Sequence, residues 1–220
     1  MKKELVIAAY DKDLSWINKL NKDVKITIYR KGTKSNNENE IVLEPNIGRC
    51  VHTFFNHILI NYEKLSDYTF FVQDYPFDHW ENVIEVINGN HIDFINESKL
   101  NIGGYFGYHW NSIGTMWSLS PSNHHNDGRV LICQSNGLPQ DNNPNIDIDK
   151  YWRILFENEP PNNYEFIPGG HFGIKNEHAK LRSKEFYQKI VNLLLDSENT
   201  PWVIERLECY IFNPNYKTKY

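Results

Sequence analysis

The first ninety residues alternate between strand-like and helical patterns of apolar positions. Residues 5–10 are a continuous apolar run and residues 24–29 alternate apolar with polar side chains, so both predict strands. Residues 11–20 carry apolar side chains at helical spacing and predict a short helix, and residues 41–43 predict a brief third strand. A strand, a helix and a second strand within about 30 residues are typical of a nucleotide-binding α/β sheet.

The clearest pattern lies in residues 44–80. Residues 45–48 (PNIG) are a turn signal, and the apolar positions from Val51 onward follow helical spacing with one buried face. Residues 68–72 are aromatic and β-branched, which is typical of a strand covered on both faces. The polar residues 73–80 follow at the carboxyl end of that strand, where open α/β sheets bind ligands. We therefore expect this turn to form one wall of a site.

The remainder of the chain predicts four helices and two short strands, separated by long irregular stretches. Ser183 is a suitable N-cap residue, and Pro201 is favoured in the first turn of a helix. The pattern is weak between residues 91 and 145, where loops rich in Gly, Pro and Asn predominate. We expect helices over residues 81–88, 149–157, 183–195 and 202–212, and strands over residues 164–167 and 172–174.

Length and composition limit the classes of protein that the chain can belong to. With 220 residues we expect one α/β domain, with a mostly parallel sheet flanked by helices and an irregular, loop-rich C-terminal half. The net charge of −5 gives no reason to expect nucleic acid as a partner. No stretch reaches the ~18 apolar residues of a transmembrane helix. The three cysteines lack the spacing of a disulfide framework or zinc knuckle, so we expect a soluble, cytoplasmic protein.

Two groups of candidate residues lie near the first strand and the central helix. Tyr10 and Asp11 end the first strand, where a carboxylate can bind ribose or base; Asp11 is equally suited to N-cap the next helix. Asn46, Gly48 and Arg49 precede the central helix. The helix macrodipole disfavours a cation at a helix start. The position of Arg49 is therefore explained if its guanidinium faces a phosphate or carboxylate. The alternative is a surface arginine paired with a glutamate.

The turn after the covered strand supplies a third group. Gln73 and Asp74 end the strand. Asp74 and Asp78 are weak candidates to hold a divalent cation, Mn²⁺ or Mg²⁺, with substrate phosphates, and Asp78 is also a candidate to orient the hydroxyls of a bound donor. His79 is a candidate general acid or hydrogen-bond donor to a phosphate oxygen, or else a neighbour of the N-cap of the next helix. A metal-dependent hydrolase that uses Asp74, Asp78, His79 and His171 is one alternative interpretation of the site.

The C-terminal half offers candidates for a second substrate. Gly169, Gly170 and His171 allow close approach of backbone to a ligand, with an imidazole on the same rim. Glu205 and Arg206 lie on the last helix, where a partly buried Glu205 is a candidate general base or else an ion-pair partner of Arg206. The aromatic, glycine-rich residues 103–110 suit a ligand platform or a packed loop, and the histidines at 124–125 are more typical of a solvated loop than of a zinc site.

Four segments of the chain resemble a family catalogued as domain of unknown function 3431. They are AYDKDLSWINKL, PNIGRCVHTFFNHILINYEKLSDYTFFVQDYPFDHW, GGHFGIKNEHAKLRSKEFYQKI and PWVIERLECYIF. The second is the most specific. The chain departs from the pattern at Cys50, where a glutamate is expected, at Asp74, where glycine is expected, and at Glu208 and Cys209, where an aromatic residue is usual.

This family looks like a distant relative of the GT-A glycosyltransferases, which implies a Rossmann-like sheet. The resemblance also implies a nucleotide-binding half over residues 1–90 and an acceptor half over residues 91–220. It implies transfer of a hexose or pentose from a nucleotide-sugar donor to a hydroxyl of a glycan or other acceptor, as in polysaccharide biosynthesis. Asn46, Gly48 and Arg49 match the donor half, and Glu205 matches the base. The place of the usual metal motif reads Gln73-Asp74-Tyr75. A non-catalytic nucleotide- or sugar-binding module remains an alternative.

Overall fold

The computed structural model describes residues 1–31, 40–89, 146–162, 164–166 and 170–215, together with the backbone of six short strands between residues 105 and 139. The aromatic stretch 103–110 lies outside the described residues except for the backbone of 105–107, and Gly169 lies outside them altogether.

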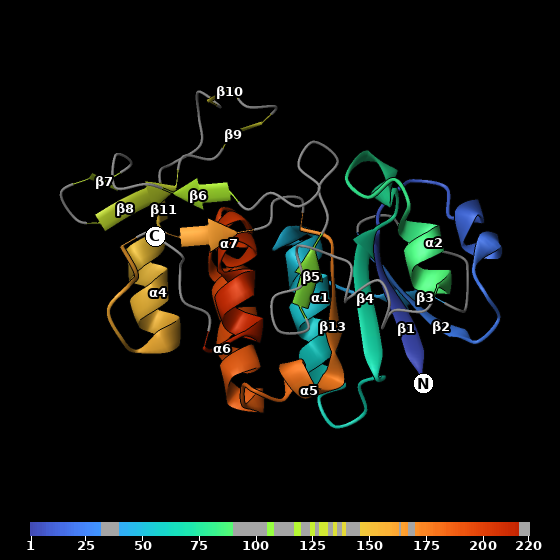
Figure 1. The fold of residues 1–220 in the computed structure, drawn as a ribbon. Coiled ribbons are helices and arrows are strands. Elements are labelled where there is room, and N and C mark those ends of the chain that lie inside the picture. Colours follow the sequence, from blue (N-terminus) through green and yellow to red (C-terminus); the bar gives the residue numbers. More distant parts are fainter. Residues whose placement is uncertain are drawn as a thin grey trace.

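A six-stranded mixed sheet forms the centre of the fold (Figure 1), in the order β3-β2-β1-β4-β13-β5. Strands β1 to β4 are parallel, as the alternation of strands and helices predicts, whereas β13 runs antiparallel to both of its neighbours. The expectation of a mostly parallel sheet flanked by helices is therefore confirmed. The strands are β1 (Lys3–Ala9), β2 (Val24–Arg30), β3 (Glu40–Val42), β4 (Tyr68–Gln73), β5 (Tyr105–Gly107) and β13 (Phe172–Lys175).

Helices cover both faces of the sheet, and small antiparallel pairs and a three-stranded sheet lie apart from it. The helices are η1 (Ser15–Lys19), α1 (Arg49–Ile60), η2 (Pro76–Asp78), α2 (Val83–Asn88), α4 (Ile148–Phe156), α5 (Asn176–Ala179), α6 (Lys184–Asp196) and α7 (Thr200–Phe212). The small sheets comprise β6 (Trp117–Leu119), β7 (His124–His125), β8 (Gly128–Leu131), β9 (Gln134–Ser135), β10 (Leu138–Pro139), β11 (Ile146–Asp147) and β12 (Tyr164–Phe166). Among the described helices, not one has the length and apolar character needed to cross a membrane.

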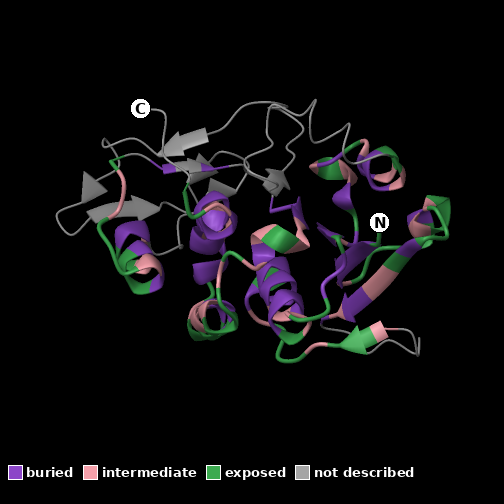
Figure 2. Cartoon of the chain, turned by 60° about the horizontal axis from the view of Figure 1, so that its bottom comes forward, coloured by how far each residue is buried: buried purple, intermediate pink, exposed green. Residues whose placement is uncertain are grey.

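Every residue of strand β1 is buried, as the colours of Figure 2 show for the centre of the sheet. Alternate residues of the strand enter two different cores. Val6 and Ala8 pack with α1, α6 and α7, whereas Leu5, Ile7 and Ala9 pack with η1 and α2. Strand β4 is covered in the same way, which confirms the interpretation of its continuous apolar run.

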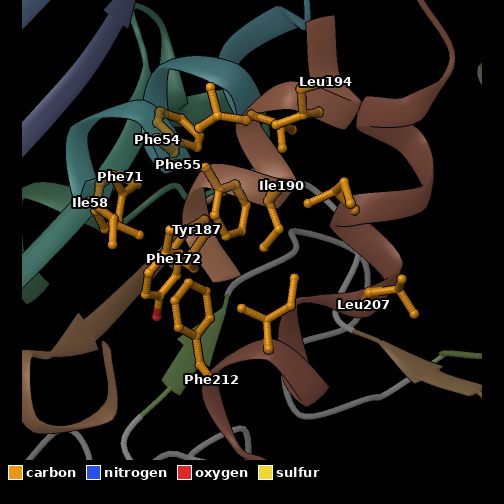
Figure 3. Packing of buried hydrophobic residues seen from close by; sticks show 14 of the residues in the cluster. Phe54, Phe55, Ile58, Phe71, Phe172, Tyr187, Ile190, Leu194, Leu207 and Phe212 are labelled. Carbon is orange, nitrogen blue, oxygen red and sulfur yellow. The ribbon is translucent and has the colours of Figure 1, made fainter. Parts of the chain in front are cut away.

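Aromatic rings fix α1 between the sheet and the pair α6 and α7 (Figure 3). Phe54 packs on Phe71 of β4, at 5.4 Å between ring centroids, and Phe55 stacks on Phe212 of α7 at 5.8 Å. Because α1 connects the carboxyl end of β3 to the start of β4, its N-terminus lies at the carboxyl edge of the parallel strands. This packing sets the position of the turn that precedes α1.

The prediction of a helix over residues 11–20 is wrong; only the 3-10 helix η1 forms there. The amides of Tyr10 and Lys12 donate to the carboxylate of Asp74, so this segment is held as a turn by a residue distant in sequence. Asp11 therefore does not cap a helix, and the N-cap position of η1 is Leu14.

The two C-terminal helices follow their local signals. The Ser183 hydroxyl accepts a hydrogen bond from the Phe186 amide at 3.3 Å, as expected of an N-cap, and Pro201 lies in the first turn of α7.

Candidate functional site

The order of the parallel strands places a topological switch point between β1 and β4. The chain proceeds from β1 to β2 and β3 on one side, and then crosses to place β4 on the other side of β1. Ligands of open α/β sheets bind outside the carboxyl ends of the strands at such a point. Tyr10 follows β1 directly and Gln73 ends β4, so both lie at this edge.

A pocket of about 540 Å³ opens at the same edge. This volume lies within the ~300–1,000 Å³ range of small-molecule sites. The pocket combines residues from the ends of β1 and β4 with the turn before α1 and the turn before α7. Its described lining residues are Tyr10, Asn46, Ile47, Gly48, Arg49, Cys50, Gln73 and Glu198.

The N-terminus of α1 lies at this pocket. Its sequence RCVH brings no acidic residue into the first turn, and no side chain of the described chain caps it. Arg49 adds an exposed guanidinium at the first helical residue, with its Cζ 4.5 Å from the ring centroid of Trp202. The unpaired amides of a helix start, its dipole and a guanidinium all favour an anion. The acidic ion-pair partner expected for a merely surface arginine is not seen among the described residues.

Gly48 is required by both its conformation and its surroundings. Its φ is 71°, and a Cβ at this position would lie 2.6 Å from the Cβ of His52 and 3.1 Å from the carbonyl oxygen of Leu194. The backbone of α6 and the side chain of α1 leave no room there. Sequence analysis correctly predicted a special backbone conformation at this glycine.

Replacing Gly48 with alanine should therefore lower the free energy of unfolding by about 1–3 kcal/mol, because strain and overlap both act against the folded state. Urea denaturation measures this. Asn46→Ala, an exposed change in the same turn, should stay within about 0.5 kcal/mol of the unaltered protein. A Gly48→Ala protein as stable as this control would contradict the assigned conformation.

Asp74 is buried and fixes the backbone at one edge of the pocket. Its side chain is 5% exposed, and its carboxylate accepts the amides of Tyr10 at 2.8 Å, Lys12 at 3.1 Å and Tyr75 at 3.1 Å. The indole of Trp16 donates to its carbonyl oxygen at 2.8 Å. These bonds tie the end of β1 to the end of β4. Asp74 is absent from the pocket lining, and its carboxylate oxygens are already occupied by amides.

The Pro-Phe-Asp-His corner lies beside the pocket and does not line it. Asp78 is exposed, and His79 packs edge-on against His171 with 5.4 Å between ring centroids. His171 is 2% exposed, and its Nε2 accepts the amide of Gln73 at 3.4 Å. Burial, aided by the neighbouring His79, lowers the pKa of His171 to about 3, so this imidazole is neutral at physiological pH. The corner is therefore connected to the pocket through His171, which packs against His79 and accepts the amide of the lining residue Gln73.

Glu205 and Arg206 lie on α7 and are not among the described residues that line the pocket. Their side chains are only 12% and 15% exposed, with 3.7 Å between the Glu205 Oε2 and the Arg206 Nη1. Both predicted features are thus present, a partly buried carboxylate and a contact with Arg206. A Cβ on Gly170, whose φ is 62°, would lie 3.8 Å from the Glu205 carboxyl carbon.

Cys50 lines the pocket and is close enough to Glu205 for the carboxylate charge to affect its thiol. Burial raises the pKa of the Cys50 thiol to about 11, and the charge of Glu205 adds to the effect. The Gln73 side-chain amide donates to the Cys50 Sγ at 3.4 Å. The thiol is therefore protonated at neutral pH and serves as part of the wall rather than as a nucleophile.

Metal ligands do not gather in the part of the chain that the structure describes. No group of three or more His, Cys, Asp or Glu side chains is arranged there to hold an ion. Asp74 and Asp78, the two weak metal candidates, accordingly form no such cluster with the described side chains.

A family model described as "Protein of unknown function (DUF3431)" matches residues 5–219. The chain belongs to this family. No curated protein and no solved structure gives a significant match to it. The matched range includes every described lining residue of the pocket, so this site lies in the DUF3431 domain itself.

Three residues around the DUF3431 pocket were missed by sequence analysis. Glu198 lines it from the turn before α7, Trp202 stacks under Arg49, and the buried Lys31 contacts the turn before α1. None has a local motif, since each reaches the site only through the packing of α6 and α7 or the pairing of β2 with β1.

Proposed function

We propose that this protein is a glycosyltransferase that moves a sugar from a nucleotide-sugar donor to a hydroxyl group of an acceptor. The observation that carries the proposal is the pocket at the switch point of the sheet, into which the N-terminus of α1 and Arg49 project. A diphosphate is the anionic part of such a donor, and this end of a helix is suited to bind it.

The described lining residues divide into two donor roles. Tyr10, at the end of β1, contacts the nucleoside, and Arg49 with the first amides of α1 binds the diphosphate. Asn46 and Gln73 offer amide groups to the remaining donor hydroxyls. The strand order β3-β2-β1-β4 supports the finer assignment to a Rossmann-like, GT-A-like fold.

The transfer step needs a base and charge stabilisation. In an inverting transfer, Glu205 takes the proton of the acceptor hydroxyl while the hydroxyl oxygen attacks the anomeric carbon, and the bond from that carbon to the diphosphate oxygen breaks. Arg49 stabilises the negative charge that develops on the leaving diphosphate. The support for Glu205 is its low exposure and its position beside Gly170 and Cys50. Gly170, His171 and Arg206 are then placed on the acceptor side.

A non-catalytic nucleotide-binding module would use the same pocket without Glu205. The hydrolase alternative needs a metal, and the described side chains form no cluster to hold one. The turnover of a Glu205 variant, described in the Discussion, separates the module from the transferase.

A thermal-shift panel of UDP-, GDP- and dTDP-sugars, each with and without Mn²⁺, tests the proposal. A donor at about 100 times its Kd should stabilise the protein by about 2.7 kcal/mol, a rise in Tm of roughly 5–10 °C for a domain of this size. Inorganic sulfate at the same ionic strength is the control. No rise with any member of the panel would contradict the proposal.

A further inference from the structure

The turn at the head of α1 has an unusual backbone at a residue that is not glycine. Arg49 has a φ of 52°, directly after Gly48 with a φ of 71°. Non-glycine residues in the left-handed region cost free energy and persist only where the surroundings hold them. The groups that hold Arg49 in this conformation are therefore part of how the site is built.

Lys31 holds the backbone of this turn. Its side chain is 1% exposed, and its ammonium group donates to the carbonyl oxygens of Ile47 at 2.5 Å and Arg49 at 2.8 Å. Its own amide donates to the carbonyl oxygen of Ala9 at 2.9 Å. One residue thus ties the end of β1 to both sides of Gly48.

Burying this ammonium group disfavours its charged form. Burial lowers the pKa of Lys31 to about 8, with Cys50 opposing the effect. His52, which faces it from α1, is kept neutral because burial and the charge of Lys31 lower its pKa to about 4. A buried cation with two backbone carbonyls as its described partners stabilises a particular turn rather than an ion pair.

Trp202 contacts the guanidinium end of the Arg49 side chain. The Arg49 guanidinium lies 4.5 Å from its ring centroid, so the side chain is oriented by α7 while the backbone is held by Lys31. A guanidinium fixed at both ends loses little conformational freedom when it binds an anion.

We propose that Lys31 is a positioning residue for anion binding: by holding the carbonyl groups of Ile47 and Arg49, it sets the Gly48–Arg49 turn in its binding conformation before the ligand arrives. This inference rests on the proposed function, because it takes the anion at Arg49 to be the diphosphate of the donor. Lys31 itself is covered by the turn and acts through Arg49.

A double-mutant cycle with inorganic pyrophosphate tests this role. Calorimetric titration is carried out on the unaltered protein, Lys31→Met, Arg49→Ala and the double variant. Lys31→Met should weaken pyrophosphate binding about tenfold when Arg49 is present and should have no further effect in the Arg49→Ala background. Equal losses in both backgrounds would mean a general structural role and would overturn the proposal.

Lys3 offers a matched control. It is also a buried lysine, and it donates to the carbonyl oxygens of Ile87 at 3.0 Å and Gly89 at 2.8 Å, at the opposite end of β1. Lys3→Met should lower Tm, as Lys31→Met does, and leave pyrophosphate affinity unchanged. A loss of affinity in Lys3→Met as large as in Lys31→Met would also overturn the proposal.

Failure of the inference differs from failure of the proposed function. If pyrophosphate and nucleotide bind the unaltered protein and their affinity depends on Arg49 but not on Lys31, only the inference is refuted. If neither ligand binds the unaltered protein, both the inference and the proposed function are refuted. If Lys31→Met does not fold, crystal structures of the unaltered protein with and without pyrophosphate decide. The proposal requires a positive φ at Arg49 in both, and a negative φ in the free protein overturns it.

Discussion

Arg49→Ala should weaken the binding of a nucleoside diphosphate such as UDP by about 10- to 100-fold. The guanidinium lines the pocket at the start of α1, and hydrogen bonds to charged groups contribute about 1.5–3 kcal/mol each. The side chain is exposed, and alanine takes over the same positive φ, so Tm should change by only a few degrees. Isothermal titration calorimetry at constant ionic strength measures the affinity.

Arg153→Ala is the matched control for this change. Arg153 is an exposed arginine on α4 whose described partner is Glu159, at 3.1 Å, and it lies outside the pocket lining. Its removal should leave the UDP affinity unchanged. If both variants bind UDP as the unaltered protein does, the anion is not held at the head of α1.

Glu205→Gln should lower the turnover number by about 10²- to 10⁴-fold while donor affinity stays within about twofold. The substitution keeps the size of the side chain but removes its ability to accept a proton, the usual contribution of a general base. Because Glu205 is not among the described residues that line the donor pocket, the donor should bind as before. Release of nucleoside diphosphate with acceptor present reports turnover, and calorimetry reports binding.

Glu185→Gln provides the control, since Glu185 is an exposed residue in the first turn of α6. It should leave both turnover and affinity unchanged. Full activity in Glu205→Gln would remove Glu205 from the mechanism, and donor binding with no turnover in the unaltered protein, across a panel of acceptors, would favour the non-catalytic module.

The sheet could be predicted because the apolar pattern of each strand indicates which of its faces are buried. The runs in β1 and β4 are apolar at every position, and both strands are covered on both faces. The segment after β1 could not, because its amides are taken by Asp74, a residue more than 60 positions away. Helical spacing of three apolar side chains gives no information about that competing partner.

The candidate site was predicted where the chemistry is local and missed where it depends on packing. Gly48 and Arg49 stand out because a turn signal and a cation precede a helix, and the structure places both in the pocket. Asp74 has an ordinary acidic side chain whose inward direction only the fold decides. Lys31 has no motif at all, since its ammonium group meets the carbonyls of Ile47 and Arg49 only after β2 pairs with β1.

A crystal structure of the protein with a bound nucleoside diphosphate tests the central claim most directly. The proposed site predicts diphosphate oxygens within hydrogen-bond distance of the Arg49 guanidinium and of the first amides of α1, with the nucleoside beside Tyr10 at the carboxyl edge of β1 and β4. A nucleotide bound away from that edge, or with its diphosphate turned away from Arg49, would contradict it.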